Sequence, residues 1–210
     1  TGVTEGVRAM TGVRVSLTTF ADFTGARGPE RARIAARLRE MYEDRSRRGW
    51  NYYREFDAAF VGGLRDGDLD ARLDRVVTEA VLPGQARHFA ELAEGARTLV
   101  SRIGAVRVLP CSPRTWTHGE LTLSVSPQVA VELRDGTQEV WFLYHKERRL
   151  EQGTADAALF VLGEVIRESG TSAVPRVVDV RAGRRFGLGR NRNRSRLSTF
   201  VTEEADELVR

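Results

Sequence analysis

The sequence is poor in the features that mark secreted and membrane proteins. Its 210 residues include a single cysteine, Cys111, so no disulfide can form within the chain. No apolar run approaches the roughly 20 residues that a membrane-spanning helix needs, and the opening residues lack the apolar segment of a signal peptide. We therefore expect a protein that does not enter a membrane and that works in the reducing cytoplasm.

Histidine is also scarce, which bears on metal binding. The three histidines are His88, His118 and His145, and their spacings match no zinc signature. With one cysteine beside them, a structural zinc site is not expected, and the sequence predicts no cofactor. Each histidine is suited to general-base chemistry by its residue type, and the alternative is a polar residue of the core or the surface.

Lysine is nearly absent, and this makes its one position conspicuous. The chain holds 32 arginines and one lysine, Lys146, together with many alanines and glycines. This bias is typical of proteins encoded by GC-rich bacterial genomes, so the number of arginines by itself indicates no function. Their distribution along the chain is more informative.

A basic segment lies at 181–196, and it contains no acidic residue. Its seven arginines are Arg181, Arg184, Arg185, Arg190, Arg192, Arg194 and Arg196. Without these seven, 26 basic residues would face 29 acidic ones, so the positive charge is local. A local basic segment is typical of proteins that bind phosphate-rich partners. It predicts contact with the phosphate backbone of nucleic acid or with an acidic protein, and the alternative is a solvated surface loop.

The first half of the chain has the apolar spacing of helices. In the segment 29–48 the residues Ile34, Ala35, Leu38, Met41 and Tyr42 recur at steps of three and four. Further helices are expected at 51–64, ended by Gly62 and Gly63, and at 68–81 and 85–103. We therefore predict a helical region over residues 1–104.

An aromatic and basic run, "RRGWNYYREF", begins the second of these helices. Tyr53 and Phe56 fit the apolar stripe of the helix, and we assign them to the core. Trp50 and Tyr52 are then the candidates for stacking on bases.

The second half, 105–210, has the pattern of an α/β domain. Residues 107–120 contain two prolines and no period, which is typical of a connector. A β-hairpin is expected within 120–146, with its turn at Asp135-Gly136. A helix at 154–169, a strand at 175–182 and a short closing helix capped by Thr202 complete the chain. The predicted fold class is α+β or α/β, with a helical N-terminal region followed by a mixed sheet and flanking helices.

The hairpin places Lys146 at the end of a covered strand. With a two-residue turn, Val131 lies opposite Val140, and Val125 lies opposite Lys146. Both faces of the segment 140–144 are apolar, so we expect a central strand that is covered on both sides. The lysine follows where this strand reaches the surface.

The order of hairpin, apolar strand ending in lysine, helix and further strand over residues 121–180 resembles the core of the PD-(D/E)XK nucleases, such as the RecB and Cas4 types. The resemblance implies that Lys146 would position or activate the attacking water. It also implies two metal-binding acids, one at Tyr144 and one near Ser126 or Pro127. None of these three residues is acidic, so this copy is expected to hold no Mg²⁺ in the manner of the family. The likeness then indicates a degenerate core that is kept as a scaffold.

Three other acids lie near the hairpin. Glu132 and Glu139 are expected to face each other beside the turn, too far from Lys146 to share an ion with it, and Glu147 follows the lysine on the opposite face. We interpret all three as solvated charges at strand ends.

These patterns leave three functional hypotheses. The leading one is a bacterial protein that binds nucleic acid without catalysis, in a role such as genome defence or plasmid maintenance, with phosphate contacts from the segment 181–196. The second is a protein-interaction module of a larger bacterial assembly. The third is a Mg²⁺-dependent nuclease that uses Lys146 and relocated acidic residues.

Overall fold

The computed structural model describes residues 12–43, 52–104, 106–189 and 192–210, except the side chains of residues 39 and 41–43. The helices are α1 (Leu17–Gly25), α2 (Gly28–Glu43), α3 (Arg54–Asp66), α4 (Leu69–Thr78), α5 (Gln85–Ile103), α6 (Gln152–Glu168) and α7 (Arg194–Val209). The strands are β1 (Val13–Ser16), β2 (Arg107–Leu109), β3 (Arg114–His118), β4 (Leu121–Val125), β5 (Val129–Glu132), β6 (Gln138–Tyr144), β7 (Val174–Asp179) and β8 (Arg184–Phe186). The predicted α+β class is confirmed. Trp50, Arg190 and the end of the predicted first helix, 44–48, lie outside the described residues.

The strands form two mixed sheets. The smaller sheet has the order β1-β4-β3, and the larger has the order β2-β5-β6-β7-β8. Two pairs are parallel, β1 with β4 and β6 with β7, and the other pairs are antiparallel. The connection from β6 to β7 runs through α6, as a parallel pair requires.

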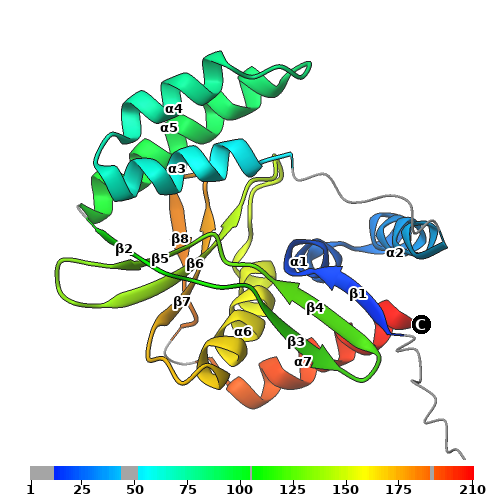
Figure 1. Cartoon of the computed structure of the whole chain (residues 1–210). Coiled ribbons are helices and arrows are strands. Elements are labelled where there is room, and N and C mark those ends of the chain that lie inside the picture. The colour runs from blue at the N-terminus through cyan, green and yellow to red at the C-terminus, as the bar shows by residue number, and fades with distance from the viewer. Residues whose placement is uncertain (1–11, 44–51, 105, 190–191) are drawn as a thin grey trace, which may run out of the picture.

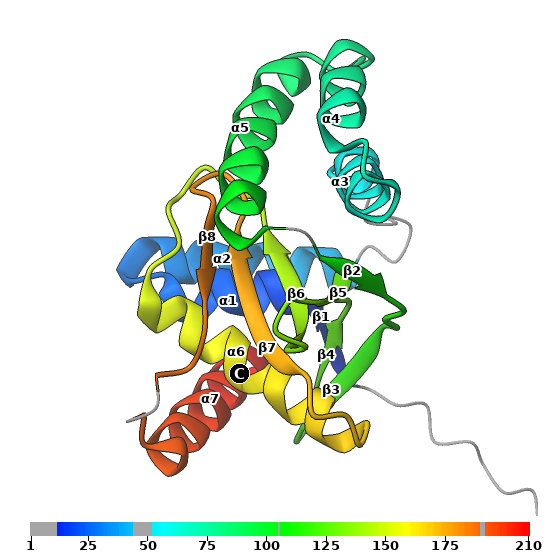
Figure 2. The ribbon, with the colours of Figure 1, turned by 90° about the vertical axis from the view of Figure 1, so that its left-hand side faces the viewer.

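The helices cover the larger sheet on both faces. Helices α3, α4 and α5 lie on one side of it, and α6 and α7 lie on the other (Figures 1 and 2). Two apolar cores result: one joins α3, α4 and α5 to the larger sheet, and the other joins that sheet to α1, α6, α7 and the smaller sheet. The predicted helical region 1–104 therefore contributes to both cores, because β1 and α1 pack with the C-terminal helices.

Strand β6 separates the two cores, and its alternation assigns its side chains to them. Phe142 and Tyr144 enter the core with α6, and Trp141 and Leu143 enter the core with α3 and α5. All four are at most 3% exposed. The prediction of a central strand covered on both faces is confirmed.

The register of the hairpin differs by one residue from the prediction. Val131 lies opposite Glu139, and Ala130 lies opposite Val140. The loop has three residues, 134–136, because Gly136 donates to Leu133 and adopts a left-handed conformation with φ of 80°. A shift of one residue exchanges the faces of a strand. Val129 and Val131 therefore share the core of Trp141.

Several short elements escaped the sequence pattern. The expected connector 107–120 contains β2 and β3, and neither β1 nor α1 was predicted. Helix α1 begins after Ser16, whose hydroxyl accepts the backbone N–H of Thr19 at 3.1 Å. Such short strands gain stability only from partners that are distant in sequence, so a local period does not reveal them.

Two predicted helix ends were wrong. Helix α3 runs through Gly62 and Gly63 and stops at Gly67, which has φ of 77°. The closing helix α7 begins at Arg194 rather than at Thr202, because the side chain of Asn193 accepts the backbone N–H of Arg196 and caps it. The predicted basic segment thus includes β8 and the first turn of α7.

Candidate functional site

Lys146 lies two residues beyond the end of β6, and its side chain is 46% exposed. Its ammonium nitrogen is 3.7 Å from Oδ2 of Asp22, which α1 supplies. Burial raises the pKa of Asp22, and the charge of Lys146 opposes that rise. The partner of the lysine therefore comes from the N-terminal part of the chain.

The residues around Lys146 do not fit the metal that the nuclease resemblance implies. Tyr144 is buried, and burial raises the pKa of its hydroxyl. Ser126 and Pro127 lie in the loop between β4 and β5 and carry no charge. In the part of the chain that the structure describes, no three histidine, cysteine or acidic residues gather as a metal site would require. Asp22 alone is too little charge for a Mg²⁺ site beside Lys146.

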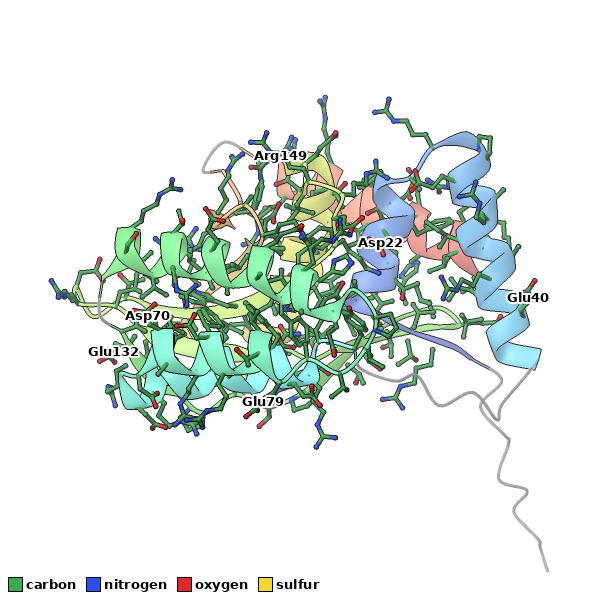
Figure 3. All side chains as sticks on the ribbon, turned by 90° about the horizontal axis from the view of Figure 1, so that it is seen from above. Asp22, Glu40, Asp70, Glu79, Glu132 and Arg149 are labelled. Carbon is green, nitrogen blue, oxygen red and sulfur yellow. The ribbon has the colours of Figure 1, made fainter. Side chains whose placement is uncertain are left out.

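Each of the other three acids near the hairpin pairs with an arginine. Glu132 is opposite Gln138, not Glu139, and it pairs with Arg107 at 2.9 Å. Glu147 lies 3.5 Å from Arg87. Figure 3 shows Glu132 toward one end of the molecule, well away from Asp22.

Glu139 is the clearest departure from the sequence prediction. It is 1% exposed, so it is not a solvated charge. Its carboxylate accepts hydrogen bonds of 2.7 Å from Arg176, Arg185 and the indole N–H of Trp141. Alternation along β6 places Glu139 on the face that carries Trp141, where Arg176 of β7 and Arg185 of β8 reach it. A buried carboxylate requires such partners.

The basic segment 181–196 does not form one patch. Arg181 pairs with Glu91 of α5, and Arg185 bonds the buried Glu139. Arg184 is exposed, with its guanidinium over the ring of Phe186. The remaining described members lie around the start of α7, and they are Arg192, Arg194 and Arg196. Arg190 lies outside the described residues.

A cavity of about 900 Å³ lies where α1 ends and where α6 and α7 begin. Five arginines line it and define what we call the arginine cavity: Arg27, Arg31, Arg148, Arg192 and Arg196. Two of them belong to the predicted basic segment, and the other three come from distant parts of the sequence. The sequence shows the latter only as short basic runs, "RGPERAR" and "KERR".

Acidic residues neutralise part of this charge. Arg192 pairs with the buried Asp156, and Arg31 lies 2.9 Å from Glu204. Arg148 is bonded to Glu30 at 3.0 Å. Arg27 and Arg196 are exposed and form no ion pair with any described residue. These two guanidinium groups are available to an anion from solution.

The helix starts add to the positive potential of the arginine cavity. Glu151 is at the N-cap of α6 without a capping hydrogen bond from its side chain, and Gly153 and Thr154 of the first turn line the cavity. Asn193 at the start of α7 lines it as well. Because backbone N–H groups and the helix dipole favour anions at such ends, the cavity is suited to a phosphate group.

The three histidines each lie beside an acid. His118 is 3.1 Å from Asp206 at the surface, and Nδ1 of His88 is 3.4 Å from Glu147. His145 is 7% exposed, and its Nε2 is 2.7 Å from Asp57 of α3. Of the predicted aromatic platforms, Tyr52 is half-buried. Tyr53, which was predicted for the core, is half-buried as well and stacks on His145 with ring centroids 4.5 Å apart.

Comparison with known proteins assigns no family. No protein-family model matches the sequence, and no curated protein is significantly similar to it. Within the described ranges no helix combines the length and the apolar character needed to cross a membrane. A functional assignment therefore rests on the geometry of the site.

Proposed function

We propose that this protein binds nucleic acid through the phosphate backbone at the arginine cavity and does not cleave it. The observation that carries the proposal is the convergence of five arginines and two helix N-termini on one cavity. Arginine is suited to phosphate because its planar fork donates two parallel hydrogen bonds. Such contacts hold a strand without reading its sequence.

The chemistry around Lys146 supports binding without cleavage. Metal-assisted phosphodiester cleavage needs clustered carboxylates, and among the described residues Lys146 has one within 4 Å, from Asp22. A core that resembles a nuclease would then serve as a scaffold for binding. We place this role in the bacterial cytoplasm, in a process such as genome defence or plasmid maintenance, where the free thiol of Cys111 would remain reduced.

The test is a pair of matched double variants. Arg27→Gln with Arg196→Gln removes the two guanidinium groups of the arginine cavity that lack a described ion pair. Arg65→Gln with Arg75→Gln removes the same charge from the exposed surfaces of α3 and α4. Binding to a labelled DNA duplex is measured by fluorescence anisotropy over a series of salt concentrations.

We expect the cavity variant to bind DNA more weakly. Its plot of log affinity against log salt concentration should be less steep by about 2, since each lost phosphate contact removes about 0.9 from the steepness. The control should retain the slope of the unmodified protein. Equal losses in both variants, or binding that does not depend on salt, would overturn the proposal. Cleavage of the DNA with Mg²⁺, abolished by Lys146→Ala, would instead support the nuclease hypothesis.

A further inference from the structure

A second cavity, of about 760 Å³, opens between the two sheets, and we call it the central cleft. It lies at the start of α1, where Ser16 and Thr19 line it, whereas the arginine cavity lies at the end of that helix. The ends of β4 and β6 and the start of α3 form its other walls. A volume of this size is typical of pockets for small molecules, which span roughly 300–1,000 Å³.

His145 supplies a fixed polar group in the central cleft. Its Nε2 is bonded to Asp57, and its ring is held between Tyr53, stacked at 4.5 Å, and Phe56, edge-on at 6.1 Å. Because a carboxylate only accepts hydrogen bonds, Nε2 carries the proton in this pair. The second nitrogen, Nδ1, is therefore left for another partner.

Nothing in the described parts of the chain occupies that nitrogen. No hydrogen bond of His145 Nδ1 to a described residue is present, and Nδ1 is not among the fully buried atoms without a partner. It therefore reaches the solvent of the cleft that His145 lines. There Nδ1 accepts from a ligand hydroxyl when the imidazole is neutral and donates to an anion when it is protonated.

The charges of the central cleft favour an anionic ligand. Arg14, Arg37 and Lys146 line it, and Asp57 is the one carboxylate among the described lining residues. Asp57 is already bonded to His145. Although Lys146 also lies 3.7 Å from Asp22, which is outside the lining, the described lining residues carry three cationic side chains and one carboxylate.

The remaining lining groups suit a sugar and a ring. Hydroxyls come from Ser16, Thr19 and Ser126, and Tyr52 and Tyr53 form an aromatic wall. We propose that the central cleft binds a small phosphorylated ligand of the size of a nucleoside monophosphate, with Lys146 and the neighbouring arginines at the phosphate and Nδ1 of His145 at a polar group of the ligand. This site shares no lining residue with the arginine cavity, so each proposal can fail alone.

The histidine signals of the full chain report directly on this site. AMP is added to the protein, and the ring C–H resonances of its three histidines are followed by NMR. We expect the His145 signals to shift and saturate, while the His118 signals stay in place because His118 lies outside the cleft. Adenosine and inorganic phosphate, added separately, should each bind at least about tenfold more weakly, because each lacks half of the contacts.

Two variants test the residues themselves. Lys146→Ala removes an exposed side chain, so folding should survive, and AMP affinity should fall about tenfold with the loss of a charged contact. His145→Ala should lower the affinity as well, whereas His118→Ala, which breaks the matched surface pair with Asp206, should not. The Arg27→Gln and Arg196→Gln variant should keep its AMP affinity.

The proposal is overturned if AMP leaves the His145 signals unmoved, or if Lys146→Ala binds AMP as tightly as the unmodified protein. Loss of AMP binding in the arginine cavity variant, with Lys146→Ala unaffected, would also overturn it and assign the ligand to the other cavity.

Discussion

Basic side chains lie near both ends of β6, but their surroundings differ. Near its start, Arg176 and Arg185 form ion pairs with the buried carboxylate of Glu139, which neutralises part of their positive charge. Beyond its end, His145 and Lys146 line a cleft. Arg148, a little further on, lines the arginine cavity. The same strand therefore has one end built for stability and one end open to ligands.

The difference shows why a count of arginines does not define a binding surface. Arg185 looks as suitable for phosphate as Arg196 in the sequence. Arg185 lies against the buried Glu139, whereas Arg196 is exposed and forms no ion pair with any described residue. An arginine that compensates a buried carboxylate cannot turn to a ligand without leaving that charge alone, which costs several kcal/mol.

The largest expected effect on stability is at the start of β6, where Glu139 is buried. Glu139→Gln should lower the free energy of unfolding by about 3 kcal/mol or more, because Arg176 and Arg185 lose the charge that compensates them. Glu132→Gln is the matched control on the neighbouring strand, and its solvent-screened pair with Arg107 should contribute little to stability. Urea denaturation measures both. Equal losses would remove the distinction between the buried and exposed pairs.

A smaller effect should separate two adjacent arginines of the basic segment. Arg185→Gln removes one charged hydrogen bond to Glu139 and should cost about 1.5–3 kcal/mol. Arg184→Gln loses its contact over the ring of Phe186 at the surface, which contributes about 0.5–1 kcal/mol. Thermal unfolding followed by circular dichroism compares the two. If Arg184→Gln is the less stable variant, the interpretation of the basic segment is wrong.

The smallest effect concerns the pH dependence of stability beyond the end of β6, where Lys146 lies beside Asp22. Lys146→Ala should raise the pKa of Asp22 further, since burial already raises it and Lys146 is the strongest opposing charge. A carboxyl whose pKa is higher in the folded state binds protons more tightly there, so stability falls as pH rises from the unfolded pKa through the folded pKa. The variant should show this fall over a wider pH range.

Carboxyl NMR titration of Asp22 and urea denaturation at several pH values measure the change. Arg149→Ala is the control, because Arg149 is exposed and is not among the charges that shift the pKa of Asp22. A pKa of Asp22 that is unaltered in Lys146→Ala would contradict the ion pair.

Local patterns in the sequence predict the long elements well. Helix α5 has the predicted bounds, 85–103, because a glycine stands at each end with φ of 77° and 75°. Helix α6 begins within two residues of its prediction, and β6 is the covered central strand that its unbroken apolar run indicates. Apolar period and turn residues act over a few positions, so they can be read directly.

Elements that depend on distant partners were missed. Strand β1 has four residues and is stabilised by parallel pairing with β4, more than a hundred residues away. The predicted register of the hairpin was wrong by one residue because Asp135-Gly136 is compatible with a loop of either two or three residues. The burial of Glu139 was missed because its partners Arg176 and Arg185 come from β7 and β8, far along the chain.

The sequence by itself determined that this chain has a covered strand followed by its single lysine, an excess of arginine near the C-terminus and no second cysteine. Only the tertiary structure decided which cations are neutralised and which remain free to act. Pairing depends on the distance between side chains, and folding brings Arg27 and Arg196 to one cavity and Asp57 to His145. Charge is a property of a residue, but its availability to a ligand is a property of the fold.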